Sequence, residues 1–383
     1  MNNSSTKYSG LNGNEMYCAY LLGYSPGDLI VGNSVFSIGF LGNLRANVRT
    51  VVGGEITTIT NMIAEGRKMS MQRFDQELVN SGGNGASGVK SDLVFHPGNI
   101  EFLTIGSALL DNINRGMNLF STASDSQELF CQWDSGYQPI SFVFGNVAYS
   151  IGIGKSIIGG LKKLIKGEVK QYSDIFNTTR NLALSRIVDE SKNKGANSVV
   201  GIRINIIPLE ATGVQEMVML GTASYNQQVA GIASSIGGVP TNHLSAEETW
   251  NIAKLGYAPL KLVLGTSVYS LGFAGGIKAA LANLVKGEIN TLTQLIYGAR
   301  EESINKLKTQ AEEITADHVL GIKNYIYDIG GGMIEFLSVG TAVKKIDGIS
   351  THTEQLPPQA IIREKDKFID LANVTYGTTI QTN

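Results

Sequence analysis

Histidine and cysteine side chains could bind a soft or borderline metal ion. The chain has six of them: His96, His243, His318, His352, Cys18 and Cys131. A site for such a metal needs these residue types clustered at short spacing. No histidine has another His or Cys two to five residues away, none recurs at equivalent repeat positions, and there is no C-x-x-C pair. We therefore predict no metal site, interpret the histidines as surface or loop residues, and expect a reducing compartment.

A glycine-rich segment, Gly152-Ile153-Gly154-Lys155-Ser156, looks like the end of a phosphate-binding loop. That motif needs a glycine five residues before Gly154, where this chain has Tyr149. The equivalent segment near the third repeat, Gly272 to Ile277, lacks the Lys-Ser pair. We predict a tight turn into a helix, and no bound cofactor.

Two sets of charged residues recur at equivalent positions in the repeats, and either set could take part in catalysis or binding. The acidic set is Glu55, Glu168 and Glu288, and the basic set is Arg67, Arg180 and Arg300. A carboxylate just past one helix end, at the start of the next helix, interacts favourably with the helix dipole, so we interpret the glutamates as first-turn residues rather than as catalytic acids. Arginine forms bonds of fixed geometry, so the arginines are predicted to make a structural ion pair or a subunit contact. No nucleophile recurs beside a histidine, and we predict no catalytic residue and no enzyme.

The second repeat carries a group of lysines that could meet phosphates or lipid headgroups. These are Lys155, Lys162, Lys163, Lys166 and Lys170. The interleaved aromatic residues of a single-strand binder are missing nearby, so a solvated helix face is favoured. The formal net charge is −2, and we expect neither nucleic acid nor a membrane surface as a partner.

Three internal repeats place these residues. Gly23-Tyr24-Ser25-Pro26 recurs as Gly136-Tyr137-Gln138-Pro139 and as Gly256-Tyr257-Ala258-Pro259. Identities then follow at fixed distances in all three copies without a gap. The repeated positions that we predict to be structural are Gly23, Tyr24, Pro26, Gly54, Arg67, Gly88, Gly136, Tyr137, Pro139, Gly167, Arg180, Gly201, Gly256, Tyr257, Pro259, Gly287, Arg300 and Gly321.

Each repeat shows the same order of elements. A β-rich run opens it and an apolar, glycine-punctuated stretch follows, whose second half is expected to be a short helix (34–52, 147–165 and 267–285). A longer amphipathic helix comes next, and in the third repeat it is predicted to run from Ile289 to about Ile314. Two strands close the unit, at Val199 to Ile207 and Glu216 to Tyr225 in the second repeat.

The repeats and the segments between them define the predicted organisation. The boundaries are an N-terminal segment 1–16, repeat 1 at 17–110, a linker 111–127, repeat 2 at 128–226, a linker 227–248, repeat 3 at 249–345 and a tail 346–383. The linkers are rich in Asn, Ser, Gly and Ala and are expected to be loops, and one short helix is expected within 354–371.

Composition favours a chain that buries surface. Charged residues make up 17% of the 383 residues, against roughly 25% in an ordinary domain, and glycines number 45. Such a chain suits either an assembly or a well-covered array of domains. The first ten residues lack the pattern of a signal peptide, and no stretch has the ~20 apolar residues of a spanning helix, so we expect a cytoplasmic location.

The order of motifs resembles the YbjQ-like domains, a family labelled heavy-metal-binding. The similarity rests on a Gly-Asn pair after the first strand, as at Gly32-Asn33, Gly-Gly at Gly53-Gly54, Ala299-Arg300 in the long helix, and Gly-Ala-x-x-Val-Val-Gly-Ile from Gly195 to Ile202. It covers most of the chain. The resemblance implies an α+β fold of three tandem β-α-β-β domains that assemble into rings, typically of five units.

The chain departs from the family pattern at two positions. The Tyr-Glu pair usual at the start of the long helix survives only as Tyr172, followed by Ser173. The family's arginine after Gly-Gly is replaced by glutamate in all three repeats. A family ligand site at these positions is therefore not expected here, whereas the scaffold is.

The function that follows is structural. We predict a non-catalytic scaffold that forms homo-oligomeric rings or stacked rings, with five chains forming rings of like repeats, as a possible part of a larger protein assembly. A rival arrangement mixes non-equivalent repeats in one ring, and fusion of the units favours a defined assembly. The alternative function is a binding module for a metal, a small molecule or a membrane surface.

Overall fold

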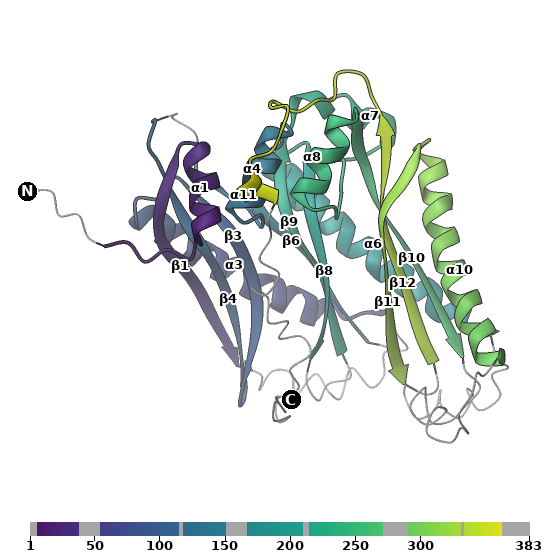
Figure 1. Ribbon diagram of the computed structural model, residues 1–383. Helices are drawn as coiled ribbons and strands as arrows, with labels where there is room; N and C mark the ends of the chain where they lie inside the picture. The colour runs from purple at the N-terminus through teal and green to yellow at the C-terminus, as the bar shows by residue number, and fades with distance from the viewer. Residues whose placement is uncertain are drawn as a thin grey trace, which may run out of the picture.

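The chain folds into three α+β units that stand side by side (Figure 1). The computed structural model describes residues 6–37, 54–114, 118–150, 167–209, 214–270, 290–330 and 333–361. Each unit has a long helix against an antiparallel sheet, which confirms the predicted α+β fold with three units. Within the described residues, no helix is both long enough and apolar enough to cross a bilayer.

Several predictions concern residues outside those described ranges. They include the short helices expected in the second halves of 34–52, 147–165 and 267–285. They also include the glycine-rich segment 152–156, the lysines 155 to 166, and Gly287 with Glu288.

The three units share a short helix, a first strand, a long helix and a closing hairpin, and differ in their shorter elements. The first contains α1 (Gly13–Leu21), β1 (Tyr24–Ser37), β2 (Gly54–Glu55), α3 (Thr57–Asn80), β3 (Gly85–His96) and β4 (Asn99–Asp111). The second contains β5 (Phe120–Ser121), α4 (Ser126–Asp134), β6 (Gln138–Ser150), β7 (Gly167–Glu168), α6 (Lys170–Asn193), β8 (Ser198–Leu209) and β9 (Val214–Tyr225). The third contains α7 (Ile232–Ile236), α8 (Ala246–Lys254), β10 (Tyr257–Ser270), α10 (Asn290–Glu313), β11 (His318–Gly330), β12 (Met333–Lys345) and α11 (Pro358–Ile361).

The sheets are linked because each repeat lends a short strand to the next. The strand orders are β1-β4-β3-β5, β2-β6-β9-β8 and β7-β10-β12-β11. Gly54 of repeat 1 lies opposite Ser150 on β6, and Gly167 of repeat 2 lies opposite Ser270 on β10. The backbone therefore joins consecutive repeats by the same hydrogen-bonding geometry twice.

Two sets of the predicted glycines adopt the left-handed conformation. Gly23, Gly136 and Gly256 have φ between 78° and 87°, between a short helix and the first strand. Gly88, Gly201 and Gly321 have φ between 62° and 64° and lie where the register of the last hairpin shifts. A β-bulge with a glycine in this conformation has that geometry, and a side chain there would be strained.

The linkers contain more structure than the sequence suggested. Helices α4 and α8 begin before the predicted starts of repeats 2 and 3, and α1 begins before that of repeat 1. Each opens on a capping box, formed by Asn12 with Glu15, Asp125 with Glu128, and Ser245 with Glu248. The expectation of loops in 111–127 and 227–248 was thus partly wrong, because these caps and strand β5 lie there. The tail helix expected within 354–371 is present as α11, whose described residues lie within the predicted range.

Candidate functional site between consecutive repeats

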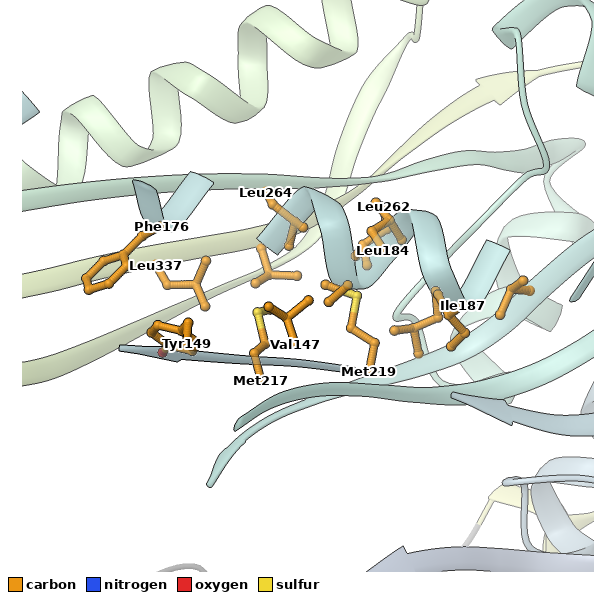
Figure 2. Packing of buried hydrophobic residues seen from close by; sticks show 14 of the residues in the cluster. Val147, Tyr149, Phe176, Leu184, Ile187, Met217, Met219, Leu262, Leu264 and Leu337 are labelled. Carbon is orange, nitrogen blue, oxygen red and sulfur yellow. The ribbon is translucent and has the colours of Figure 1, made fainter. Parts of the chain in front are cut away.

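The long helix of one repeat lies between two sheets. Helix α6 packs on its own strands β6 and β9 and also against β10 and β12 of repeat 3. Figure 2 shows Leu184 of α6 facing Leu262 and Leu264, while Met217 and Met219 lie on the opposite side of the helix. Helix α3 makes the equivalent junction with repeat 2. Apolar surface on both faces of these helices is buried, which stabilises the order of the repeats.

A buried ion pair crosses the first junction. Arg67 donates from Nε and Nη2 to the carboxylate of Glu216, at 3.2 and 2.8 Å, and neither side chain is exposed. The remaining Nη1 donates to the carbonyl and hydroxyl oxygens of Ser91, at 3.0 and 2.9 Å. Such a pair is retained only with good geometry, because desolvation of both charges is costly.

The second junction repeats this pair. Arg180 binds Glu335 of repeat 3, and its guanidinium carbon lies 5.3 and 5.1 Å from the ring centres of Tyr149 and Phe176. Burial raises the pKa of the Glu335 carboxyl, and the positive charge of Arg180 opposes that rise. The first two predicted arginines therefore each join one repeat to the next, whereas Arg300 is half-buried on the last helix.

Hydroxyl groups at the start of the long helices bind the next repeat. The backbone N–H of Ala148 on β6 donates to Thr60 Oγ1 at 2.9 Å. The N–H of Val268 on β10 donates to Ser173 Oγ at the same distance. These residues occupy the positions where the chain departs from the family's Tyr-Glu pair, so the replacement serves the junction.

The repeated glutamates also act across the junctions, which corrects their expected role. Glu55 and Glu168 lie in β2 and β7, before helices α3 and α6 begin, and not in a first helical turn. Glu55 pairs with Arg186 of the next repeat at 2.8 Å, and Glu168 with Lys306 at 3.4 Å. The extended backbone at these positions follows from their pairing with the neighbouring sheet.

His243 lies in the segment that joins repeats 2 and 3. Its Nε2 donates to the carbonyl of Gly321 at 2.7 Å, and its Nδ1 lies 2.8 Å from Thr341 Oγ1. Burial lowers the pKa of the imidazole, and the nearby Lys323 lowers it further. The neutral ring, protonated at Nε2, satisfies both contacts.

We expect the protein to lose stability as the pH falls through about 6.5, the usual pKa of an unfolded histidine. Below that pH the unfolded chain binds a proton that folded His243 resists, so the free energy of unfolding decreases down to the lowered folded-state pKa. Urea denaturation at pH 7.5 and 5.5 measures the loss. His243→Gln should reduce the pH dependence, whereas His352→Gln, on an exposed segment, should not. Equal pH dependence in both variants would contradict this role.

A cleft of about 470 Å³ opens beside His243. Its lining includes Glu128, which pairs with Arg203 at 3.2 Å, and His243, whose nitrogens are both engaged. Among the described residues no three His, Cys, Asp or Glu side chains group as a metal would require. Burial raises the pKa of the Cys18 thiol to about 12, which disfavours the thiolate that binds metals. These donors do not fit a heavy-metal ion.

Sequence reasoning missed the acidic half of the ion pairs. Glu101, Glu216 and Glu335 occupy one register position, opposite Val35, Ala148 and Val268 on the first strands. Their distances from the opening glycine differ by one or two residues, because the preceding hairpins differ in length, so fixed spacing does not reveal them. The capping boxes, at constant spacing before that glycine, were a signal that could have been found.

Comparison with known proteins finds relatives that match a single repeat of this chain and one that matches more than half of it. A family model described as "Putative heavy-metal-binding" (YbjQ) matches residues 25–109, 136–227 and 249–346. An encapsulin nanocompartment protein of Mycobacterium tuberculosis is 26% identical over 223 residues, which are 57% of this chain and 83% of the relative. UPF0145 proteins of Clostridium novyi and Vibrio campbellii are each 38% identical, over 86 and 81 residues. Those matches cover 22% and 21% of this chain, and 82% and 77% of the relatives.

Proposed function

The chain belongs to the YbjQ family, with three tandem copies of its domain, and we propose that it is a non-catalytic scaffold that forms homo-oligomers. The observation that carries this is the junction between repeats, which occurs twice with the same ion pair, hydroxyl contact and borrowed strand. A domain that binds its own kind through one reproducible interface is suited to assembly. The similarity to an encapsulin nanocompartment protein supports a role in a larger structure.

The arrangement that we propose places non-equivalent repeats in one ring. Rings of like repeats from five chains, which the resemblance suggests, would need a second kind of interface, because the inter-repeat face is already used within the chain. The mixed arrangement needs only one kind. Strand β1 of repeat 1 and helix α10 of repeat 3 lie on opposite sides of the molecule (Figure 1), so two chains with six repeats form the smallest closed ring. The thiols of Cys18 and Cys131 are both buried and not in a disulfide, which suits a reducing compartment such as the cytoplasm.

We expect a native mass of about 82 kDa, twice the 41.0 kDa of one chain, by light scattering on a sizing column. A mass of about 205 kDa would instead support five chains and rings of like repeats. A protein that stays at 41.0 kDa at tens of micromolar would contradict the scaffold function.

The cleft beside His243 favours one second candidate, a binding module for a small polar molecule. Its lining combines an acid, a base and amides, including Glu128, Arg203 and Asn205. A stoichiometric transition metal in the purified protein would favour a metal-binding module instead and would contradict the donor chemistry above.

A further inference from the structure

The face of repeat 1 that corresponds to the covered face of the other repeats is open. Its outward side chains on β1 are Leu29, Val31 and Val35, which are 44%, 46% and 57% exposed. The equivalent residues are Phe142, Phe144 and Ala148 in repeat 2, and Leu262, Leu264 and Val268 in repeat 3. Those in repeat 3 are at most 1% exposed, and Phe142 and Ala148 are 5% and 0% exposed. The long helix of the preceding repeat, α3 or α6, covers those residues, whereas no described helix covers Leu29, Val31 and Val35.

The other surface is on helix α10 of repeat 3, the equivalent of α3 and α6. Helix α10 lies at the edge of the molecule, with no described sheet beyond its outer side (Figure 1). Tyr297 is 61% exposed and Thr293 is exposed on this helix. Thr293 occupies the position of Thr60 and Ser173, which are buried and accept a backbone N–H from the next repeat.

The charges on the two ends match the pairs inside the chain. Arg300 on α10 is equivalent to Arg67 and Arg180, and no described acidic residue lies within ion-pair distance of it. Glu101 on β4 is equivalent to Glu216 and Glu335, and its side-chain hydrogen bonds among the described residues are with its own repeat, at His96 (2.8 Å) and Asn33 (3.1 Å). Each end therefore carries one half of the ion pair that the two internal junctions complete.

The backbone edges match as well. Residues 120–124 bind the edge of β3, and residues 240–242 bind the edge of β8, while both contact the first strand of the following repeat. Tyr8 already binds β1 in the equivalent way, through the N–H of Leu29 at 2.6 Å. Among the described strands, β11 pairs with β12 alone, so its outer edge has no such partner.

We propose that these two ends bind each other in separate chains: α10 of one copy covers the β1 face of a second copy, and Arg300 pairs with the second copy's Glu101. The inference rests on the proposed scaffold function and specifies the residues that join its chains. Its occupant is a second copy because every contact is a third instance of a junction already present twice. A heterologous contact of this kind closes into a ring that contains a multiple of three repeats, or continues as a filament.

Charge reversal tests the contact in the full-length protein. Arg300→Glu and Glu101→Arg should each weaken association about 30-fold or more, because two like charges meet in a desolvated pair. Each variant alone should run at the mass of one chain. An equimolar mixture, and the double variant, should return to the wild-type mass, because every junction then again joins an acid to a base.

The outcomes separate the inference from the function on which it rests. A wild-type protein that is itself one chain would overturn both. A wild-type oligomer whose two variants keep its mass would overturn the proposed contact alone. Glu301→Arg and Glu77→Arg reverse exposed charges on α10 and α3 and should leave the mass unchanged. The residues equivalent to Glu301, which are Lys68 and Asn181, stay exposed beside the internal junctions. Equal melting curves of the variants and these controls, at concentrations where all are single chains, exclude misfolding.

A cysteine pair gives a second, geometric readout. In the chain with Val35→Cys and Thr293→Cys, the new thiols lie at opposite ends, so an oxidised link must form between chains. We expect linked chains on a non-reducing gel, with one closed species for a ring and a ladder for a filament. No linkage in an oligomer of wild-type mass would show that another surface joins the chains.

Discussion

Replacing Glu216 by Gln lowers the free energy of unfolding by about 3–5 kcal/mol. The change leaves the guanidinium of Arg67 without its counter-charge in a site where neither side chain is exposed to water. Ser91 satisfies only Nη1, so it cannot replace the carboxylate that binds Nε and Nη2. Chemical denaturation followed by circular dichroism and tryptophan fluorescence measures the loss.

The controls for this prediction separate charge from packing. Glu77→Gln, on the exposed side of α3, should change the free energy by less than about 0.5 kcal/mol. The double variant Arg67→Met with Glu216→Met removes both charges and should be more stable than Glu216→Gln. A loss below about 1 kcal/mol in Glu216→Gln would mean that the buried pair does not stabilise the junction.

Gly145→Ala lowers the free energy of unfolding by about 3 kcal/mol, because strand β6 and helix α6 touch through their backbones at this glycine. A Cβ atom here would lie 2.2 Å from the carbonyl oxygen of Ala183 and 2.5 Å from the nitrogen of Ile187. Backbone atoms cannot rotate away as a side chain can, so α6 must move off the sheet and open the core that it shares with repeat 3. Thermal and urea unfolding both measure the effect.

Gly298→Ala is the matched control, because this glycine lies within helix α10 with open space around it. There the substitution should stabilise the protein by about 0.5–1 kcal/mol, through the helix propensity of alanine. Equal effects of the two substitutions would contradict the close contact. The equivalent Gly32 and Gly265 face backbone oxygens at 2.1 and 2.0 Å, so their substitution should resemble that of Gly145.

The sequence predicted the parts of the fold that depend on local pattern. The strands expected at 199–207 and 216–225 lie within β8 and β9, and the helix expected to end near Ile314 ends at Glu313. Alternation of apolar residues, helical periodicity and turn glycines act over a few residues, so one chain contains the information. The glycines at 88, 201 and 321 are an example, since glycine adopts the left-handed φ of these positions without the steric cost of a side chain.

Only some residues of the junctions between repeats could be predicted from the sequence. The arginines recur at a fixed distance and were identified as an ion pair or a contact, but their partners were not. Glu55 and Glu168 also recur, but the role predicted for them was wrong. Each lies in a two-residue strand that pairs with the sheet of the next repeat, and so short a strand cannot be recognised from the sequence. His243 was interpreted as a surface or loop residue, although it is buried between repeats 2 and 3.

The sequence by itself determined the three repeats, the α+β class and the positions of the glycines, because identity at fixed spacing and short-range periodicity need no folded chain. Only the tertiary structure decided which face each helix covers, and it paired Arg67 with Glu216 and Arg180 with Glu335. These partners are 149 and 155 residues apart in the sequence. The last hairpins of the repeats differ in length, so the glutamates do not recur at a fixed distance from the opening glycine. Such a pair forms only when the repeats pack side by side, because packing places the arginine and the glutamate in one site without water, where each charge needs the other.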